Sequence, residues 1–271
     1  MLKVRTGAIA ALLAAAALQP ACLLAQARVP GDPYSGDPVG IVDQPCPEHP
    51  KPSDGAGWQM WNLHMLTRDF GQLCRYAAQN AVLKKAGPAG IVFMGDSITD
   101  NWINLDPGFF ADGRVDRGIS GQTTPQMLVR FRQDVILLHP RAVHIMAGTN
   151  DIAGNSGAAT IATVQGNIES MAELARAHGI RVILASIPPA SAFPWSPGMK
   201  PAPQILALNA WLRAYARRNH FTYVDYHEAM ADRDGGMKPG LSSDGVHPTA
   251  AGYGVMAPLA LAAIRAALGR N

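Results

Sequence analysis

The sequence predicts a three-layer α/β domain with a mostly parallel β-sheet. Short apolar runs of strand-forming composition alternate along the chain with longer segments whose apolar residues recur at helical spacing. Several of the short runs end in polar, glycine-containing turns. The carboxyl ends of parallel strands share one edge of a sheet, and ligands bind there in open α/β folds. We therefore expect a functional site at that edge.

The expected strands and helices alternate in order. The apolar runs predict strands at 90–95, 114–119, 142–147, 181–187 and 221–225. The helical spacings predict helices over 57–86, 124–138, 160–177, 204–219 and 250–268. A proline-rich loop is expected over 188–203. No internal repeat interrupts this order, so residues 57–271 are expected to form one domain.

The first 27 residues have the features of a secretory signal peptide. Lys3 and Arg5 supply a basic start, and residues 8–18 form an apolar run that is short for a bilayer span. Residues 25–27, Ala-Gln-Ala, match a cleavage site with small residues at both ends. We therefore predict a periplasmic or secreted protein, with no stable membrane span once this segment is removed.

Residues 28–56 are predicted to form an irregular arm. The segment is rich in Pro, which fixes φ and removes a backbone donor. Removal of the signal peptide would leave two cysteines, Cys46 and Cys74. Cysteines in an exported chain can pair, so a Cys46–Cys74 disulfide and two free thiols are the alternatives, and we favour the disulfide.

Composition and motifs exclude several classes of function. The formal net charge is +3, and charged residues make up only 16% of the chain. Without a block of Lys and Arg, the sequence lacks the electrostatic footprint of a nucleic-acid-binding protein, so no nucleic-acid partner is expected. It also lacks a Walker loop, a His-Glu-x-x-His helix and the Gly-x-Ser-x-Gly elbow of ordinary α/β-hydrolases.

A candidate nucleophile follows the first predicted strand. The run Ile91-Val92-Phe93-Met94 ends in Gly95-Asp96-Ser97, which places Ser97 at the carboxyl end of that strand. Ser97 is therefore a possible nucleophile, and the alternative is that it only caps the next helix. This stretch by itself favours neither role.

The rest of the chain supplies partners for a nucleophilic serine. A serine needs a base, which is usually a His held by an acid. Asp244 and His247 are three residues apart, so the carboxylate can reach the His Nδ1–H and leave Nε2 free for Ser97. Donors for an oxyanion are expected from the backbone N–H of Gly118 and the side-chain amide of Asn150, each in a turn after a predicted strand.

These residues resemble the motifs of the SGNH or GDSL hydrolases. The resemblance extends from residue 91 to about residue 254, and its one mild departure is Ile98 in place of the usual Leu. The four matching blocks are Gly95-Asp96-Ser97-Ile98, Arg117-Gly118-Ile119-Ser120-Gly121, Gly148-Thr149-Asn150-Asp151 and Asp244-Gly245-Val246-His247-Pro248.

The resemblance implies a fold and a set of roles. The fold would be a flavodoxin-like α/β/α sandwich with a five-stranded, mostly parallel sheet. Ser97 would be the nucleophile, His247 the base and Asp244 the acid that orients it. The N–H groups of Ser97 and Gly118 and the amide of Asn150 would form the oxyanion hole. Neither a metal nor a cofactor is needed in this family, so we expect none.

The substrate is expected to be an acyl ester of a small molecule or a glycan. Location and family favour short acyl groups, especially acetyl esters of carbohydrates. Trp102, Phe193 and Trp195 are candidates for the walls of a substrate groove. A lysophospholipase or thioesterase acting on longer chains is the first alternative, and it would need an apolar channel near 188–203. A non-enzymatic protein that binds a phosphate at the Gly-Asp-Ser turn is a minor alternative.

Overall fold

The computed structural model describes residues 33–34, 36–49 and 53–269. The chain divides into two compact units, Met1–Pro50 and Lys51–Asn271. The predicted signal peptide lies outside the described residues.

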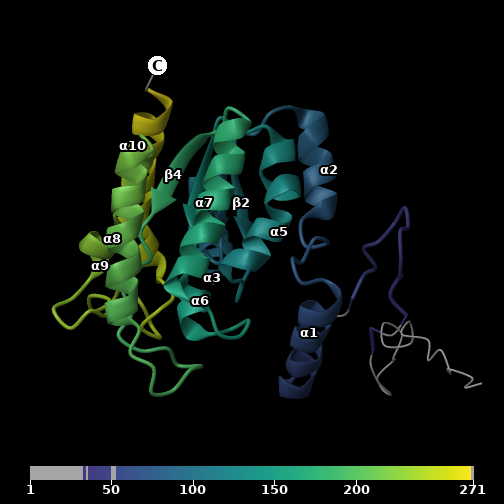
Figure 1. Cartoon of the computed structure of the whole chain (residues 1–271), viewed down its shortest axis with the longest axis horizontal. Helices are drawn as coiled ribbons and strands as arrows, with labels where there is room; N and C mark the ends of the chain where they lie inside the picture. The colour runs from purple at the N-terminus through teal and green to yellow at the C-terminus, as the bar shows by residue number, and fades with distance from the viewer. Residues whose placement is uncertain (1–32, 35, 50–52, 270–271) are drawn as a thin grey trace, which may run out of the picture. The chain divides into compact units, whose positions relative to one another are not determined.

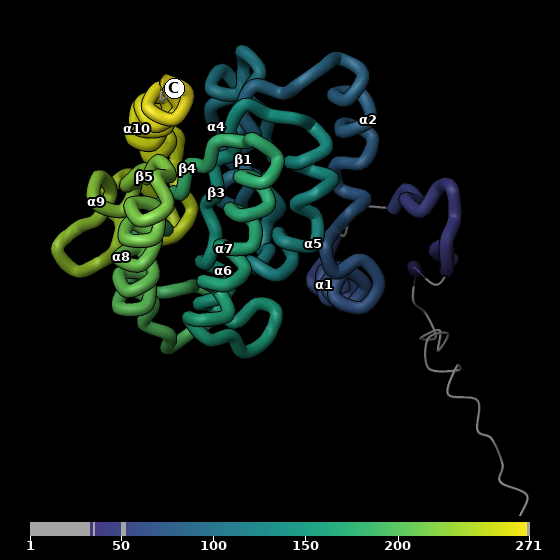
Figure 2. Tube along the Cα trace, turned by 45° about the horizontal axis from the view of Figure 1, so that its top comes forward, coloured from purple at the N-terminus to yellow at the C-terminus, as the bar shows by residue number. Residues whose placement is uncertain are grey.

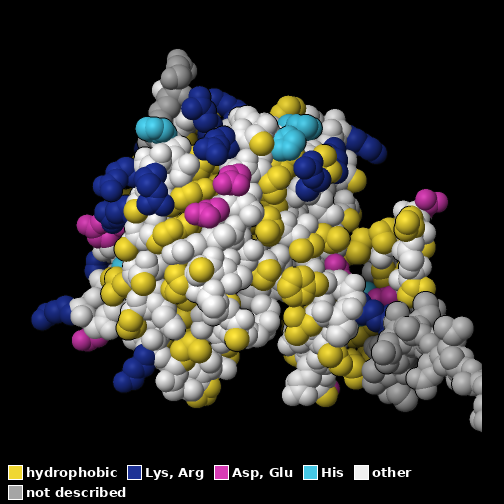
Figure 3. Space-filling model, in the orientation of Figure 1, with side chains coloured by type: hydrophobic (Ala, Val, Ile, Leu, Met, Phe, Trp, Pro, Cys, Tyr) yellow, Lys and Arg dark blue, Asp and Glu magenta, His cyan; other side chains and the backbone are white. Residues whose placement is uncertain are grey.

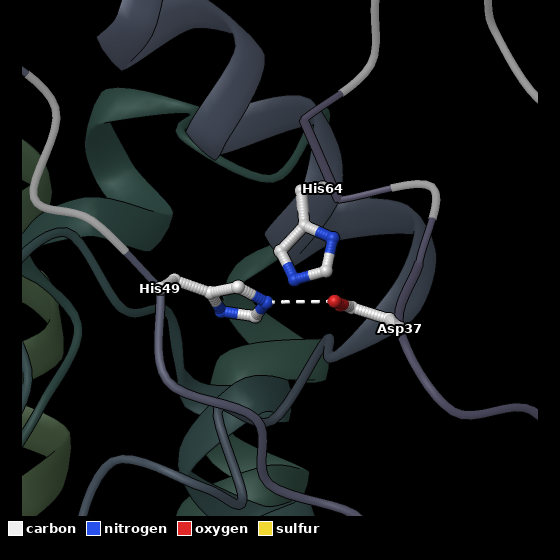
Figure 4. Close-up of side chains that lie close together, drawn as sticks. All are labelled: Asp37, His49 and His64. Atoms are coloured by element: carbon white, nitrogen blue, oxygen red, sulfur yellow. Dashed lines mark hydrogen bonds and ion pairs between the residues drawn. The ribbon is translucent and has the colours of Figure 1, made fainter.

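The described residues of the first unit form turns and irregular backbone. Within this unit, His49 Nε2 lies 2.8 Å from Asp37 Oδ1 (Figure 4). The His49 ring also meets the ring of Tyr34 edge to face. Cys46 belongs to the first unit and Cys74 to the second, and each is disulfide-bonded. The pairing of these two cysteines with each other stays a prediction.

The second unit is built on a five-stranded parallel sheet, as the sequence predicts. Its strands are β1 (Ile91–Gly95), β2 (Arg114–Gly118), β3 (Ala142–Met146), β4 (Arg181–Ala185) and β5 (Thr222–Val224). Their order across the sheet is β2-β1-β3-β4-β5. This is the flavodoxin-like order, in which the direction of winding reverses between β1 and β3. Gly95 pairs in register with both Gly118 and Met146, so the ends of the first three strands lie at one edge.

Helices cover both faces of the sheet. One face packs against α5 (Thr124–Asp134), α7 (Ile161–Ala177) and α8 (Ala202–Arg218), which lie in front of the strands in Figure 1. The other face packs against α10 (Ala250–Leu268) and the short α4 (Trp102–Leu105), and Figure 2 shows the strands between the two helical layers. The three-layer fold class is confirmed.

Helix α10 is the most apolar helix of the second unit's outer layers. By length and composition it could cross a bilayer, and 33% of its most apolar stretch is buried within the domain. Its side chains Tyr253, Met256 and Ala260 are fully buried in the core beneath the sheet. Because that face is already occupied by the strands, we interpret α10 as a covering helix of the domain.

The first predicted helix is interrupted. In place of one helix over 57–86, the structure has two helices, α1 (Gly55–Arg68) and α2 (Ala77–Ala86), which are separated by turns. The Asp69 carboxylate accepts the backbone N–H of Leu73 at 2.8 Å, and Gln72 has a left-handed φ of 52°. Asp favours such local bonds over a continuing helix, which is why helical spacing of the apolar residues was misleading here. The short helices α3 (Ser97–Asp100), α6 (Thr149–Ala153) and α9 (Tyr226–Met230) follow strand ends.

Strand β2 lies at the outer edge of the sheet, and its outward backbone groups bond to side chains of the same domain. The Gly118 N–H donates to Asp116 Oδ1 at 2.6 Å. The Gly118 carbonyl accepts from the Tyr76 hydroxyl, and the Asp116 carbonyl accepts from Arg117 Nη1. The carboxyl-terminal part of this edge therefore already has internal hydrogen-bond partners.

Basic residues gather at the amino-terminal edge of the strands. Figure 3 shows many Lys and Arg side chains at the end of the molecule where α7 and α8 terminate. Arg176 ends α7, and Arg217 and Arg218 end α8. Cations at helix C-termini are favoured by the helix dipole, so these charges have a structural explanation.

Candidate active site

Ser97 begins α3 directly after strand β1. A Cβ on Gly95 would overlap Thr99 Oγ1, so a glycine is required for α3 to fold back against the strand. The helix cap is supplied by Asp96, whose Oδ1 accepts the Ile98 N–H at 3.0 Å. Burial raises the pKa of Asp96 to about 6, although this hydrogen bond works against the shift. Because Asp96 caps the helix, the Ser97 hydroxyl is not needed for that role.

The structure brings Ser97, His247 and Asp244 together. His247 Nε2 lies 2.9 Å from Ser97 Oγ, although the two residues are 150 positions apart. His247 Nδ1 lies 2.6 Å from Asp244 Oδ2. The other oxygen, Asp244 Oδ1, accepts the N–H groups of Val246 at 2.9 Å and His247 at 2.8 Å. This is the geometry that lets an imidazole remove a proton from a serine hydroxyl.

The environment keeps Asp244 ionised. Partial burial works to raise the pKa of its carboxyl, but the hydrogen bonds from the His247 side chain and from the backbone outweigh it and lower the pKa to about 2. Among the described residues, no group of three close His, Cys, Asp or Glu side chains includes Asp244 or His247. Asp244 and His247 form a hydrogen-bonded pair with the geometry of an orienting acid and a base.

Asn150 lies on α6, at the end of strand β3, and is buried. Its side-chain Nδ2 donates to the Gln122 carbonyl at 3.1 Å, and its Oδ1 accepts from Asn155 Nδ2 at 2.8 Å. One hydrogen of the Nδ2 group is used by Gln122. The second is available to a ligand, as the oxyanion role requires.

The structure does not support Gly118 as an oxyanion donor. Its N–H is already bonded to Asp116, and a Cβ at Gly118 would overlap the backbone of Asp100, so this glycine is required for packing against α3. Burial raises the pKa of the Asp116 carboxyl to about 7, while the Gly118 N–H works against that shift. Three residues later, Gly121 has a φ of +79° and open space beside it.

Gly121 is therefore the glycine of this segment that fits the oxyanion role. Throughout the described part of the chain, no acceptor bonds the N–H groups of Ser97 and Gly121. The Gly121 carbonyl accepts from Asn155 Nδ2 at 3.4 Å, which places Gly121 beside Asn150. Within this sequence block the hydrogen bonds favour Gly121 over the predicted Gly118.

Two of the three predicted groove residues are buried in the core. Trp102 is 0% exposed and stacks between Phe109 and Tyr253. Phe193 is 1% exposed and packs in the core cluster beneath α8. Neither side chain can line a solvent-accessible groove, so both predictions were wrong. Trp195 is different: it is 41% exposed, and its ring centre lies 5.9 Å from that of His247.

A buried cation supports the site, and the sequence reasoning missed it. Arg130 on α5 is 0% exposed. Its Nη2 donates to the Gly95 carbonyl at 3.0 Å, and its Nε donates to Gln122 Oε1 at 2.6 Å. Its Nη1 pairs with Asp134 Oδ2 at 3.1 Å, and Asp134 Oδ1 accepts from Asn80 Nδ2 at 2.6 Å. An Arg and an Asp four residues apart, on the helix face that also carries Met127 and Phe131, were the signal that could have revealed this network.

A cavity of about 520 Å³ lies along the outer edge of the sheet. Strand β2 forms one wall, and Tyr76, Ile103 and Phe110 contribute to the others. Ser97, Asn150 and His247 do not line it. This cavity is thus separate from the candidate active site.

Comparison with known proteins places this geometry in a family. The profile of the GDSL-like lipase/acylhydrolase family matches residues 93–255. No curated protein matches the chain.

Solved structures agree with this match. A candidate acylhydrolase from Bacteroides fragilis is 48% identical, with a TM-score of 0.71 over 74% of this chain and 99% of that chain. A GDSL-like lipase from Bacteroides thetaiotaomicron is 47% identical, with a TM-score of 0.69 over 73% of this chain and 100% of that chain. An acetylxylan esterase from Geobacillus stearothermophilus is 22% identical, with a TM-score of 0.53 over 66% and 95%, and shares the fold. With its sheet order, its motif blocks and these matches, the chain belongs to the GDSL-like lipase/acylhydrolase family.

Proposed function

We propose that this protein is an exported serine esterase that hydrolyses short-chain acyl esters. The observation that carries the proposal is the contact of Ser97 Oγ with His247 Nε2 at 2.9 Å, with Asp244 behind the imidazole. Ser97 attacks the ester carbonyl carbon while His247 takes the hydroxyl proton. The protonated imidazole then gives that proton to the leaving alcohol. Water repeats the two steps on the acyl-enzyme and releases the acid.

The developing oxyanion needs donors that meet it only in the transition state. In our proposal these are the N–H groups of Ser97 and Gly121 and the Asn150 amide. Two of them have no acceptor in the described part of the chain, and the third keeps one hydrogen free. Preorganised donors of this kind stabilise the tetrahedral intermediate without reorganisation.

The packing of the 188–203 loop supports a short acyl group. This loop was the segment that could have formed a long apolar channel, but Ala190 and Phe193 are buried in the core. Trp195 remains as an exposed aromatic face whose ring centre lies 5.9 Å from that of His247. An aromatic face suits the apolar side of a sugar ring, so acetyl esters of carbohydrates are our first choice.

A series of p-nitrophenyl esters tests the acyl preference. We expect kcat/KM to fall by about tenfold or more from the acetate to the octanoate, because Ala190 and Phe193 pack into the core and do not form a channel for extra methylenes. The Ser97→Ala variant serves as the blank for spontaneous hydrolysis. A rise in kcat/KM towards the octanoate would instead favour the lysophospholipase or thioesterase alternative. A panel of acetylated glycans then tests whether the alcohol part of the substrate is a carbohydrate.

Export is proposed from the sequence, since the signal segment lies outside the described residues. We expect the mature chain to begin at Arg28 when the gene is expressed with its leader. N-terminal sequencing of periplasmic and culture-medium fractions checks this. Recovery of the chain only in the cytoplasm, with residues 1–27 attached, would contradict it.

A further inference from the structure

A chain of hydrogen bonds runs from the exposed Trp195 to the candidate oxyanion donor. The Trp195 Nε1–H donates to Asn155 Oδ1 at 3.1 Å. Asn155 Nδ2 donates in turn to Asn150 Oδ1 at 2.8 Å. We propose that Asn155, itself fixed by the Trp195 indole, is a positioning residue that holds the Asn150 amide with its N–H₂ group towards the oxyanion. The proposal rests on the serine esterase function proposed above.

The side-chain amide of Asn150 presents two chemically different ends. Asn has a carbonyl oxygen and an N–H₂ group of similar size, and rotation by about 180° exchanges them. If Asn150 turned over, its oxygen would face the negative oxyanion and repel it. Some contact must therefore select one orientation of Asn150.

The indole makes the selection unambiguous, because a Trp N–H can only donate. Its proton must meet the oxygen of Asn155, so the N–H₂ group of Asn155 faces Asn150. That group can only donate, so it meets the oxygen of Asn150. The Asn150 N–H₂ group is then left for the Gln122 carbonyl and the oxyanion. The Gln122 carbonyl, which can only accept, and the Trp195 N–H, which can only donate, thus favour the same orientation of Asn150 from its two sides.

The packing around these residues holds the indole in place. The Trp195 ring stacks on the buried Phe193, with centres 5.1 Å apart and planes at 17°. Asn155 is anchored by its backbone N–H, which donates to the Asn150 carbonyl at 3.0 Å. Its next neighbour, Ser156, lies 2.8 Å from Thr123 through their hydroxyl oxygens. Water normally competes with exposed hydrogen bonds, and these contacts restrict the positions of Trp195 and Asn155 so that their hydrogen bond can persist.

The Asn155 amide also lies 3.4 Å from the Gly121 carbonyl, so it contacts the residues of two of the three proposed oxyanion donors. An interaction that aligns oxyanion donors acts in the transition state and leaves ground-state binding unchanged. Loss of this alignment should therefore lower kcat and leave KM nearly constant. A merely structural role would lower Tm or raise KM instead.

Two substitutions each remove a different hydrogen bond of the Trp195–Asn155–Asn150 series. Asn155→Asp keeps an acceptor for the indole but removes the donor to Asn150, and we expect kcat for p-nitrophenyl acetate to fall by about 10–100-fold. Trp195→Phe keeps the stacked ring but removes the N–H, and we expect a smaller fall of about 3–10-fold because Asn155 is no longer held. KM should change by less than about twofold in both. Matched controls are Asn219→Asp at the end of α8 and Trp211→Phe, whose ring stacks on Tyr215.

A double-mutant cycle with Asn150→Ala decides whether the effect passes through Asn150. In that background Asn155→Asp and Trp195→Phe should each change kcat by less than about twofold, because there is no amide left to orient. The proposal is overturned if both single variants have wild-type kcat, or if their losses persist undiminished in the Asn150→Ala background. Should Asn155→Asp lower Tm, Trp195→Phe still provides the test. Hydrolysis that survives Ser97→Ala would refute the esterase mechanism itself, which is a distinct outcome.

Discussion

Replacing Ser97 by Ala should lower kcat for p-nitrophenyl acetate by about 10⁴–10⁶-fold, because the acyl-enzyme can no longer form. Residual turnover would come from direct attack of water on the ester, with the oxyanion donors stabilising the intermediate. The fold should survive, since Asp96 and not Ser97 caps α3. A fluorophosphonate should label the wild-type protein on the peptide that contains Ser97 and leave the variant unlabelled, as mass spectrometry would show.

The matched control for this prediction is Ser170→Ala. The Ser170 hydroxyl donates to the Gly166 carbonyl within α7, so the substitution removes a hydroxyl from a part-buried helix position without touching the site. Its kcat should equal that of the wild type. If Ser97→Ala retains wild-type turnover while folded, the nucleophile assignment is wrong.

Replacing Arg130 by Met should lower the free energy of unfolding by about 3–5 kcal/mol, the range for removing one partner of a buried ion pair. Met fills much of the same space but leaves the Asp134 carboxylate without its cation. The Gly95 carbonyl keeps the Ile119 N–H but loses its second donor, and Gln122 Oε1 loses the Arg130 donor. Burial lowers the pKa of Arg130, and the Asp134 carboxylate works against that shift. The charged form of Arg130 is therefore stabilised by Asp134. Urea unfolding followed by far-UV circular dichroism measures the loss.

Arg132→Met is the control, because Arg132 is exposed on the same helix. It should change the free energy of unfolding by less than about 0.5 kcal/mol. Combining Arg130→Met with Asp134→Asn should recover part of the loss, since no uncompensated charge then remains. Equal stabilities of the Arg130→Met and Arg132→Met variants would show that the buried network does not stabilise the domain.

The sequence predicted the parts of the site that depend on local spacing. Ser97 follows an apolar run, and the separation of Asp244 from His247 lets one carboxylate reach both the imidazole and the backbone. The fold class and the strand positions followed from alternation alone, because parallel strands buried on both faces read as short apolar runs. Residues far apart in the chain then meet because the strand ends share an edge.

The errors arose where tertiary contacts decide. Gly118 and Gly121 are three residues apart and equally permissive, but Asp116 occupies the N–H of the first. Trp102 and Phe193 are aromatic residues in irregular segments, and whether such residues line a groove or fill the core depends on which helix packs over them. Neither distinction can be read from residue type or spacing.

The hydrogen bonds at the outer edge of β2 have a consequence for how the molecule behaves in a crowded compartment. An uncovered edge strand is a template on which a strand from another chain can add, which leads to aggregation. In this domain Tyr76, Asp116 and Arg117 already satisfy outward backbone groups of β2. An incoming strand would have to displace them before it could pair. The side chains that bond to the Gly118 backbone thus also hinder the addition of a foreign strand at this edge of the sheet.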